Sequence, residues 1–408
     1  MKLTTKILLG LIAGIILGLF LTGSPHIATD YIHPFGTLFL NLIKMIIVPL
    51  VLSSLVVGAA SIGDPKKLGR IGGKTMLYYL ATTCVAVIIG LILGNLFTPG
   101  AGLTIPIDAS VEAVEAPSLT ETLLNMVPTN PIAALVNGDM LQIIVFALSI
   151  GIAIAVLGEK GKPLYNFFDS LAEVMYKITG FIMTLAPYGV FALIVPVVAT
   201  NGPSVLLPLI KVIAAVYIGA IIHSAVVYSS AVKLFAKMSP LRFFKGISQA
   251  ATVAFSTSSS AGTLPVTLRN VQENLGVSES ISSFVLPLGA TINMDGTALY
   301  QGICALFVAQ VYGLDLSLAQ QLTIVLTATL ASIGTAGVPG AGLVMLTMVL
   351  QSVNLPLEGI ALLAGIDRIL DMARTTVNIV GDASASVVVA ASEGELVSIE
   401  DIEIAESY

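Results

Sequence analysis

The chain has 408 residues, of which 56% are hydrophobic and only 10% are charged, with a formal net charge of −6. Soluble proteins carry about 25% charged residues because their surface faces water, so this composition excludes a soluble globular protein of that length. The acidic balance gives no reason to expect nucleic acid. The two cysteines, Cys84 and Cys304, lie far apart in apolar runs and predict neither a disulfide framework nor a zinc site.

Apolar segments separated by polar or Gly/Pro-rich breaks occupy the first half of the chain. A helix needs about 20 residues to cross the roughly 30 Å hydrocarbon core of a bilayer, and we interpret these segments as six spanning helices. Three of them, 31–60, 123–157 and 164–199, are longer than necessary and are expected to tilt or kink. Lys2 and Lys6 precede the first segment, which has no small-residue cleavage site, so we expect an attached helix rather than a signal peptide.

The basic residues predict the orientation of the chain in the membrane. In our topology the outer loops contain acidic residues but no lysine or arginine. The positive-inside rule then places both termini in the cytoplasm of a multi-pass protein of the plasma (inner) membrane. The basic residues on the cytoplasmic side are Lys2, Lys6, Lys66, Lys67, Arg70, Lys74, Lys160, Lys162, Lys233, Lys237, Arg242, Lys245 and Arg269.

Two later segments have the pattern of helical hairpins. Residues 246–275 contain AFSTSSSAGTLPVT and residues 318–354 contain ASIGTAGVPGAG, so each has an apolar arm, a tip of small residues and proline, and a second arm. Each arm is too short to cross the bilayer, and the charge pattern is kept only if each segment returns to the side that it entered from. Irregular backbone at membrane depth is tolerated where protein or a polar cavity surrounds it. We therefore expect two re-entrant hairpins.

The two hairpins resemble each other. SSSAGTLP aligns with SIGTAGVP when Pro265 is laid on Pro339, and an interrupted or polar helix follows each hairpin, 280–311 and 357–391. The first hairpin must open from the cytoplasm and the second from outside, which is the pattern of an inverted repeat with a binding site near the membrane midplane. The alternative is a pair of unrelated glycine-rich loops between helices.

The segment 365–382, GIDRILDMARTTVNIVGD, places polar residues in an otherwise apolar helix. At about 100° per residue they fall within an arc of about 80°. They are Asp367, Asp371, Arg374, Asn378 and Asp382. An ionisable residue at the centre of a spanning helix costs roughly 2.5–3.5 kcal/mol, and Arg374 can pair with Asp371. We expect Asp367 and Asp382 to lack a basic partner and to lie beside cations; the alternative is a purely structural network.

A second polar cluster lies in the preceding helix, in LPLGATINMDGTALYQG. Asn293, Asp295 and Thr297 stand beside Gly289 and Gly296, where good helix formers would be expected. An unwound helix frees backbone carbonyls, and hard cations such as Na⁺ bind carbonyl, amide and carboxylate oxygens. We therefore expect a broken helix that binds cations.

The mixture of charges also predicts an organic substrate. A buried carboxylate can hold an ammonium, and a guanidinium can bind a carboxylate in bidentate fashion. Amide groups at the hairpin tips, near Ser259, Ser260 or Gly337, can cap a second carboxylate. An acidic amino acid fits this set of groups, whereas a plain dicarboxylate leaves Asp371 without a partner.

Four motifs in this order resemble those of the dicarboxylate/amino acid:cation symporter family, which includes the glutamate transporters. They are the serine-rich hairpin ending in GTLP, NMDGT, GTAGVPGAG and DxxxDxxRTxxNxxGD, and the resemblance covers nearly the whole chain. It implies an all-α polytopic membrane protein with eight transmembrane helices, two re-entrant hairpins and inverted repeats, assembled as a homotrimer.

The resemblance further implies an elevator fold, in which a transport domain moves against a static scaffold. Residues 1–74 would form scaffold helices 1 and 2, residues 75–98 helix 3 of the transport domain, and residues 99–199 an outer loop with scaffold helices 4 and 5. The transport domain would continue through 200–392 with helix 6, both hairpins and helices 7 and 8. Residues 393–408 would be a solvated acidic tail in the cytoplasm.

The family pattern implies roles for individual residues. Arg374 with Thr297 would hold the side-chain carboxylate of the substrate and Asp371 its ammonium, while Asn378 with Ser260 would hold the α-carboxylate. The full set expected to bind the substrate is Ser258, Ser259, Ser260, Thr297, Gly337, Val338, Asp371, Arg374, Thr375 and Asn378.

The same pattern implies three Na⁺ sites. The first would combine Gly289, Asn293, Asn378 and Asp382; the second the carbonyls of Ser332, Ile333 and Thr335; the third Tyr79, Thr82 and Thr83 with Asn293 and Asp295.

One position departs from part of the family. Some relatives have an arginine in the serine cluster of the first hairpin, where this chain has Ser258, and this chain has Arg368 in the last helix. We hypothesise that Arg368 replaces that arginine.

The expected function is secondary active uptake of L-aspartate or L-glutamate, driven by co-transported Na⁺, with no organic cofactor and no enzymatic activity. Alternatives within the class are a H⁺-coupled symporter of acidic amino acids or C4-dicarboxylates, and a neutral amino acid transporter, which would leave Arg374 without a substrate carboxylate. An ion channel or an intramembrane enzyme is the alternative from other classes, although HExxH, GxSxG and P-loop motifs are missing. The sequence identifies no partner for His223.

Overall fold

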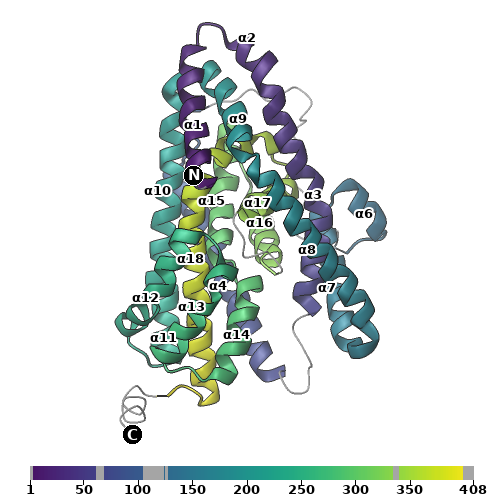
Figure 1. Cartoon of the computed structure of the whole chain (residues 1–408), viewed down its shortest axis with the longest axis vertical. Helices are drawn as coiled ribbons and strands as arrows, with labels where there is room; N and C mark the ends of the chain where they lie inside the picture. Colours follow the sequence, from purple (N-terminus) through teal and green to yellow (C-terminus); the bar gives the residue numbers. More distant parts are fainter. Residues whose placement is uncertain (1–2, 61–68, 104–123, 125–126, 334–339, 398–408) are drawn as a thin grey trace.

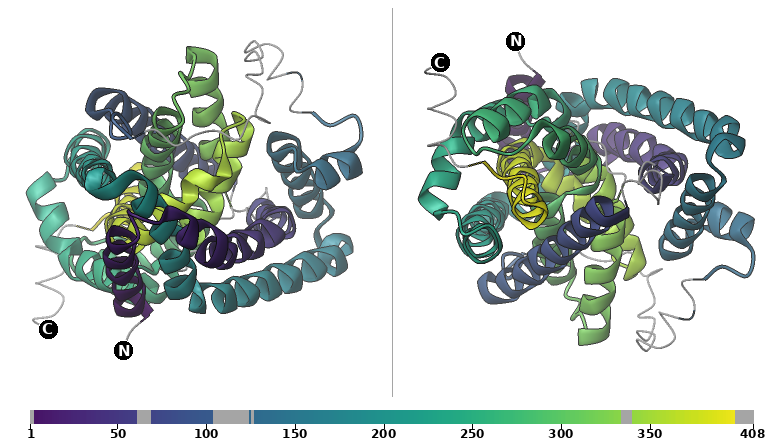
Figure 2. Two further views of the ribbon diagram at one scale, coloured as in Figure 1. Left: turned by 90° about the horizontal axis from the view of Figure 1, so that it is seen from above. Right: turned by 90° about the horizontal axis from the view of Figure 1, so that it is seen from below.

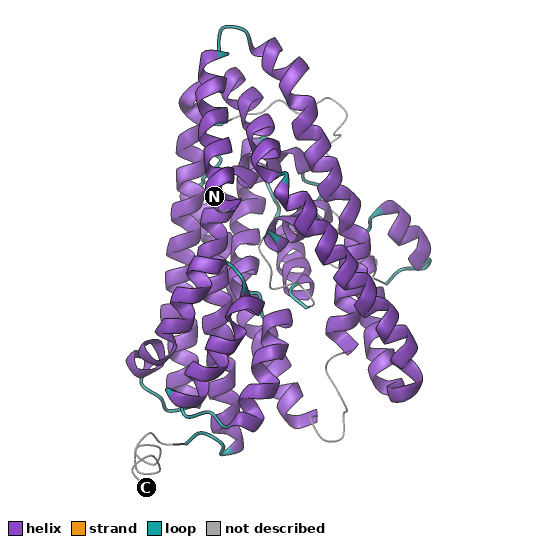
Figure 3. Cartoon of the chain, in the orientation of Figure 1, coloured by secondary structure: helices purple, strands orange, loops and turns teal. Residues whose placement is uncertain are grey.

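The computed structural model of the chain describes residues 3–60, 69–103, 124, 127–333 and 340–397. Helices make up nearly all of this described part, which contains no β-strand (Figure 3). The predicted all-α class is therefore confirmed. Three helical stretches among the described residues are long and apolar enough to cross a bilayer, namely Arg70–Phe97, Gln142–Ile182 and Gly202–Phe235. The total of eight spanning helices stays a prediction.

The helices of the first half of the chain are, in order, α1 (Leu3–Phe20), α2 (Pro25–Ile27), the π-helical turn η1 (Ala28–Ile32), α3 (His33–Ala60), α4 (Gly69–Phe97), α6 (Pro131–Asn137), α7 (Met140–Leu157), η2 (Gly158–Gly161), α8 (Lys162–Thr184) and α9 (Ala186–Asn201). The second half contains η3 (Gly202–Val205), α10 (Leu206–Ile222), the π-helical turn η4 (His223–Tyr228), α11 (Ser229–Phe235), α12 (Pro240–Thr257), α13 (Ser260–Glu273), α14 (Glu279–Ile292), α15 (Asp295–Val311), α16 (Leu318–Ala331), α17 (Ala341–Ser352), η5 (Leu357–Gly359) and α18 (Ile360–Glu393).

Two long segments that the sequence presents as single helices are broken. The segment 123–157 is interrupted after α6, because Gly138 adopts a left-handed conformation with φ 76° that ends the helix. The segment 164–199 is interrupted at Leu185, and Pro187 follows in the first turn of α9, where a proline needs no amide partner. The kinks that we expected in these two long segments are therefore interruptions at Gly138 and Leu185.

The helices pack in two groups. α1 packs on α9, and α3 packs on α7, α8 and α9. In the second group α4 lies along α15, while α10, α12, α14 and α15 surround α18. Figure 1 shows α18 in yellow along the long axis of the molecule, and the two end views of Figure 2 place α7 and α8 at the periphery. α18 therefore forms the centre of the second group.

Both predicted hairpins are pairs of helices that pack against each other, α12 with α13 and α16 with α17. The first pair turns at Ser258, which is left-handed with φ 52°. The tip of the second pair, 334–339, lies outside the described residues. The helix after the first hairpin is broken between α14 and α15, as expected, whereas α18 after the second is continuous. Their path relative to a bilayer stays a prediction.

The beginning of the expected acidic tail is attached to the rest of the fold. Lys74 and Arg70 of α4 form ion pairs with Glu393. The Val397 amide donates to the Gly276 carbonyl at 2.8 Å. The hydroxyls of Ser278 and Ser280 donate to the Glu395 carboxylate and hold the pKa of Glu395 below its usual value. Because that carboxylate is ionised at neutral pH, the attachment is complete there and weakens only as acidification protonates Glu395. The described start of this segment is therefore not a free tail.

Glycines allow α4 to approach α15 closely. A Cβ atom added to Gly90 would lie 2.2 Å from the carbonyl oxygen of Leu299, and one added to Gly302 would lie 2.9 Å from the carbonyl oxygen of Val87. Backbone atoms cannot give way as a flexible side chain can, so only glycine fits at such contacts. Tyr79 and Thr83 lie one to three turns before this close contact on the same helix.

The packing predicts opposite effects for two glycines of α4. Gly90→Ala should lower stability by about 1–3 kcal/mol, because the added methyl group forces α4 away from α15. Gly73→Ala should be neutral or stabilising by up to about 1 kcal/mol, because a Cβ atom at Gly73 meets nothing within 4 Å and alanine favours a helix. Thermal denaturation of both purified variants in detergent checks this. Equal melting temperatures would contradict the described contact.

Candidate functional site

The break between α14 and α15 faces α18. α14 ends at Ile292 because Asn293 has an extended backbone, with φ −89° and ψ 101°, and α15 begins at Asp295. The Gly296 amide at the start of α15 donates to Asn378 Oδ1 of α18 at 2.8 Å. A Cβ atom at Gly296 would lie 2.3 Å from the carbonyl oxygen of Arg374, so glycine is required for this approach. The broken helix that the sequence predicted is confirmed, and it joins both polar clusters.

The first oxygen cluster forms around Asn293. Its Nδ2 donates to Asp382 Oδ1 at 2.9 Å and to the Asn378 carbonyl at 3.0 Å. Asn293 Oδ1 is buried and has no hydrogen-bond partner among the described residues. A Cβ atom at Gly289 would lie 2.4 Å from both Asp382 Oδ1 and the Tyr79 hydroxyl, which shows how closely these oxygens gather around the α14 backbone. The four residues of the first predicted cation site therefore lie together.

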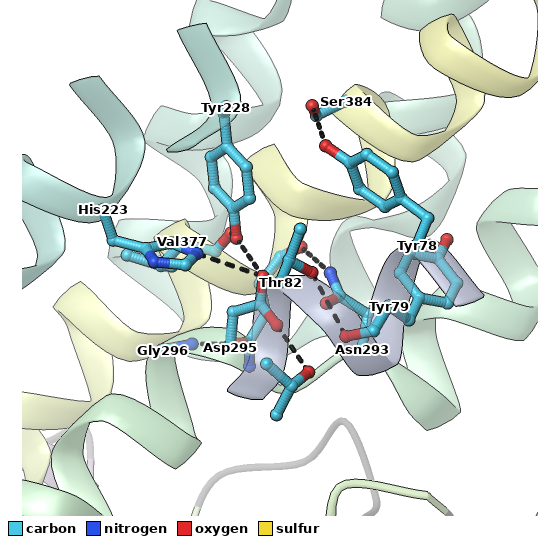
Figure 4. A network of polar contacts seen from close by, with 12 residues as sticks. Tyr78, Tyr79, Thr82, His223, Tyr228, Asn293, Asp295, Gly296, Val377 and Ser384 are labelled. Atoms are coloured by element: carbon cyan, nitrogen blue, oxygen red, sulfur yellow. Dashed lines mark hydrogen bonds and ion pairs between the residues drawn. The ribbon is translucent and has the colours of Figure 1, made fainter. Parts of the chain in front are cut away.

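A second oxygen cluster forms around Asp295 (Figure 4). Thr83 Oγ1 donates to Asp295 Oδ1 at 2.6 Å, and the Tyr228 hydroxyl donates to Asp295 Oδ2 at 2.7 Å. His223 Nε2 lies 3.2 Å from the same Oδ2. Thr83 and Asp295 belong to the third predicted cation site, whereas the sequence assigned no role to His223 or Tyr228.

The two other α4 residues of that predicted site are buried nearby, and their hydroxyl groups donate to backbone carbonyls. The Tyr79 hydroxyl donates to the Val285 carbonyl at 3.1 Å, and Thr82 Oγ1 donates to the Tyr79 carbonyl at 3.2 Å. Tyr78, the neighbour of Tyr79, forms a hydrogen bond of 2.6 Å between its hydroxyl and Ser384 Oγ. The α4 segment is thus held against α14 and α18 through hydroxyl groups.

Asp295 and Asp382 are buried carboxylates without a lysine or arginine partner in the described part of the chain. Their exposed fractions are 0% and 1%. Removing a carboxylate from water costs several kcal/mol even after the protein relaxes, and hydrogen bonds from neutral groups do not balance its charge.

No group of three or more His, Cys, Asp or Glu residues that could hold a metal ion exists among the described residues. The donors present are hydroxyl, amide and carboxylate oxygens, which fit a hard cation such as Na⁺ rather than a transition metal.

Arg374 of α18 is buried and makes two ion pairs within its own helix. Nη1 lies 2.9 Å from Asp367 Oδ1, and Nη2 lies 2.9 Å from Asp371 Oδ1. The guanidinium also lies 4.2 Å from the centre of the Tyr300 ring. The expectation that Asp367 lacks a basic partner was therefore wrong, because the long arginine side chain points toward the N-terminus of its helix and reaches residues on two preceding turns.

The guanidinium of Arg374 is enclosed by carboxylates of α18 and by the second hairpin. Nη1 and Nη2 each face a carboxylate oxygen of α18 at 2.9 Å, whereas Nε has no hydrogen-bond partner among the described residues. The second hairpin covers this group, since a Cβ atom at Gly342 of α17 would lie 2.9 Å from the guanidinium carbon. The Gly340 amide of the same hairpin donates to Asp371 Oδ2 at 3.4 Å. A carboxylate that reached Arg374 would compete with Asp367 and Asp371 for the donors of the guanidinium.

The tip of the first hairpin presents small polar groups beside α18, against which both α12 and α13 pack. Ser258 is buried, and its hydroxyl has no hydrogen-bond partner among the described residues. Ser259 caps α13 by accepting a bond of 3.0 Å from the Gly262 amide, and Ser260, also buried, begins the helix. This is the positive end of the α13 dipole, where an anion is stabilised.

Arg368 connects α18 to the first hairpin. Its Nη2 donates to the Thr257 carbonyl at 3.0 Å, and its Nη1 lies 3.9 Å from Asp371 Oδ2. The position agrees with the hypothesis that this arginine serves the hairpin from the last helix.

The remaining predicted residues divide between buried positions and positions outside the described residues. Thr297 and Thr375 are 6% and 5% exposed, and Ser332 and Ile333 are buried at the end of α16. Thr335, Gly337 and Val338 lie outside the described residues, so the second predicted cation site is described only in part. Their roles as ligands stay predictions.

Comparison with known proteins gives consistent matches over nearly the whole length. The sodium:dicarboxylate symporter family matches residues 3–392. A proton/sodium-glutamate symport protein of Geobacillus stearothermophilus is 43% identical, covering 96% of this chain and 95% of the relative. A proton/glutamate-aspartate symporter of Escherichia coli (strain K12) is 42% identical, covering 95% and 92%. A C4-dicarboxylate transport protein of Bacillus subtilis (strain 168) is 36% identical, covering 99% and 97%.

These relatives are transporters rather than enzymes, and the family match includes the broken helix, both hairpins and the polar face of α18. The chain belongs to the sodium:dicarboxylate symporter family.

Proposed function

We propose that this protein is a secondary active symporter that takes up acidic amino acids, L-glutamate or L-aspartate, together with Na⁺. The observation that carries the proposal has two parts: a buried arginine, Arg374, whose ion pairs lie within its own helix, and two buried carboxylates that have no lysine or arginine partner among the described residues, Asp295 and Asp382. The first feature accepts an anionic group of the substrate. The second requires mobile cations, so one site provides for both ligands.

An acidic amino acid can exchange partners with the existing ion pairs. Its ammonium would bind Asp371, which releases Nη2 of Arg374 for the substrate's side-chain carboxylate. Asp367 would remain paired with Nη1 and would keep the guanidinium in place. A dicarboxylate brings no ammonium for Asp371, and a neutral amino acid brings no second carboxylate for Arg374. An acidic amino acid therefore fits these charges better than the ligands of the two alternatives.

The α-carboxylate would lie between Asn378 and the tip of the first hairpin. The N-terminus of α13 and the buried hydroxyl of Ser258 supply positive potential and an unused hydroxyl there. Thr297 and Thr375 supply further hydroxyl groups from α15 and α18. The remaining proposed contacts are Ser259, Ser260, Gly337 and Val338.

Coupling would arise because cations and substrate use connected groups. Asn378 accepts from the Gly296 amide through its side chain and from Asn293 through its carbonyl, so it belongs to both the cation cluster and the substrate cluster. Na⁺ bound near Asp382 would hold the broken helix in the geometry that the substrate needs, and the substrate would raise Na⁺ affinity by the same factor. Ser332, Ile333 and Thr335 of the second hairpin would complete another Na⁺ site as that hairpin closes.

The movement that we propose is an elevator within a homotrimer of the inner membrane. Residues 1–74 and 99–199 would form the static scaffold, and residues 75–98 and 200–392 the moving domain, with both termini in the cytoplasm. Support comes from the packing, in which α1, α3, α7, α8 and α9 form one group and α4 packs with the helices around α18.

Proton coupling is the second candidate, because the names of two relatives above include a proton. The oxygen-rich surroundings of Asn293 and Asp382 favour Na⁺, since a proton needs one acceptor rather than several converging oxygens.

The first prediction concerns the driving ion. Uptake of labelled aspartate or glutamate into proteoliposomes should be saturable and should require an inward Na⁺ gradient, and binding should weaken by at least about tenfold when choline replaces Na⁺, because coupling energies of 1–3 kcal/mol are typical. A pH gradient alone, without Na⁺, is the matched control. Full uptake under that control would establish proton coupling instead.

The second prediction concerns Arg374. Arg374→Gln should weaken binding of aspartate and glutamate by about 100-fold or more, because two hydrogen bonds between charged groups are lost at about 1.5–3 kcal/mol each. A neutral amino acid should lose far less. Arg269→Gln, which removes an exposed arginine paired with Glu273, is the control and should bind normally. Equal losses for acidic and neutral amino acids would refute the proposed role of Arg374.

A further inference from the structure

The helix that passes Asp295 is not a regular α-helix where it does so. Between α10 and α11 the residues His223–Tyr228 form the π-helical turn η4, which packs against α4 and α18. π-turns are rare within helices and are found often at functional sites. His223 and Tyr228 are the first and last residues of this turn, and both are fully buried.

We infer that η4 is a positioning device for the Asp295 carboxylate: His223 and Tyr228 hold Oδ2, and Oδ1 is thereby presented to a Na⁺ ion beside Thr83. This inference rests on the proposed function, because it assigns two further residues to one of its cation sites. Neither residue would touch the ion.

The π turn explains how two residues five positions apart reach one oxygen atom. In an α-helix, side chains five residues apart point about 140° away from each other. In a π turn the hydrogen bonds run from residue i to residue i+5, and the wider turn brings such side chains closer to one face of the helix. The rings of His223 and Tyr228 accordingly pack edge to face with centres 4.8 Å apart (Figure 4). A regular helix would turn one of them away from Asp295.

Both contacts are directed at the same carboxylate oxygen. The Tyr228 hydroxyl donates to Oδ2 at 2.7 Å, and His223 Nε2 lies 3.2 Å from it. We assign the proton of this contact to Nε2, because the carboxylate that a cation would bind only accepts hydrogen bonds. Nδ1 of His223 has no partner among the described residues, which leaves Asp295 as the one polar contact that the structure gives this ring.

The surroundings make room for this arrangement. A Cβ atom at Gly381 of α18 would lie 2.6 Å from the Tyr228 hydroxyl and 2.5 Å from Asn293 Nδ2. Glycine at this position therefore lets two side chains approach the α18 backbone: Tyr228 from the Asp295 cluster and Asn293 from the Asp382 cluster. The Tyr228 hydroxyl also lies 3.2 Å from the Val377 carbonyl, which fixes the ring between α15 and α18.

The two oxygens of Asp295 are consequently unequal. Oδ2 is occupied by two donors, whereas Oδ1 accepts only from Thr83 Oγ1, at 2.6 Å, among the described residues. Without the hydrogen bonds from η4, the Asp295 carboxylate can rotate. Oδ1 would then no longer be held in one position beside Thr83. Groups that orient metal ligands from behind typically change cation affinity by about 10–100-fold when they are removed.

A purely structural role would have a different signature. If Tyr228 and His223 only satisfied a buried acid, their loss would lower stability and leave the Na⁺ requirement unchanged. If they position Asp295, the Na⁺ requirement should change while the affinity for the amino acid at saturating Na⁺ stays the same.

The test uses the purified full chain and the variants Tyr228→Phe, His223→Leu and His223→Gln. One readout is the Na⁺ concentration that gives half of the thermal stabilisation without amino acid; the other is calorimetric affinity for aspartate at low and saturating Na⁺. Tyr217→Phe is the matched control, because it removes a tyrosine hydroxyl of α10 that donates to the Ile369 carbonyl at 2.9 Å, away from Asp295.

Tyr228→Phe and His223→Leu should raise the half-maximal Na⁺ concentration by about tenfold or more, with aspartate affinity at saturating Na⁺ within about twofold of the unmodified protein. His223→Gln, which keeps a donor, should recover part of the difference. A shift no larger than that of Tyr217→Phe would overturn the inference while the proposed function stands. A lack of Na⁺ response in the unmodified protein would overturn both the positioning inference and the proposed Na⁺ coupling. The measurements on the unmodified protein and on Tyr217→Phe therefore distinguish failure of the inference from failure of the proposed function.

Discussion

The negative charge of a carboxylate buried away from water must be compensated by a cation or by hydrogen bonds. The structure around α18 depends on how four acidic side chains obtain this compensation. Asp367 and Asp371 share the guanidinium of Arg374, whereas Asp295 and Asp382 receive hydrogen bonds from neutral groups. Hydrogen bonds reduce the cost of burial but leave the charge in place. The break in the α14–α15 segment, the close approach of α4 and the glycines around the site all bring polar atoms to these acids.

Periodicity and helix propensity were sufficient to predict the polar face of α18 and the break before α15. The spacing of polar residues in α18 placed five of them on one buried face, and the Asn, Asp and Gly residues after Ile292 indicated the break. The sequence did not predict that Asp367 pairs with Arg374, because that contact depends on the direction and reach of a long side chain. It did not indicate a partner for His223 either. A π turn has no clear sequence signature, and Asp295, which His223 contacts, lies 72 residues further along the chain. The length of the segments 123–157 and 164–199 indicated tilt or kinks but not their positions at Gly138 and Leu185, because apolar composition outweighed the helix-ending signals of glycine and proline.

The two hairpins relate differently to the site, although their sequences are alike. The first presents a left-handed serine and a helix N-terminus. The second places Gly342 against the guanidinium of Arg374, so that backbone rather than a side chain covers the group. A cover made of backbone and small residues has little side-chain entropy to lose when it orders. The first hairpin therefore brings a helix N-terminus toward α18, whereas the described arm of the second brings backbone close to the Arg374 guanidinium.

The attachment at the end of α18 has a practical consequence for measurement. Residues 394–397 are joined by backbone hydrogen bonds to the α13–α14 connection and, through Glu393, to α4. A spin label or dye placed at the exposed Val397 would therefore report the position of α4 and of the α13–α14 connection, to which this segment is bonded. Paired with a label on α8, it would measure the distance between the two groups of helices.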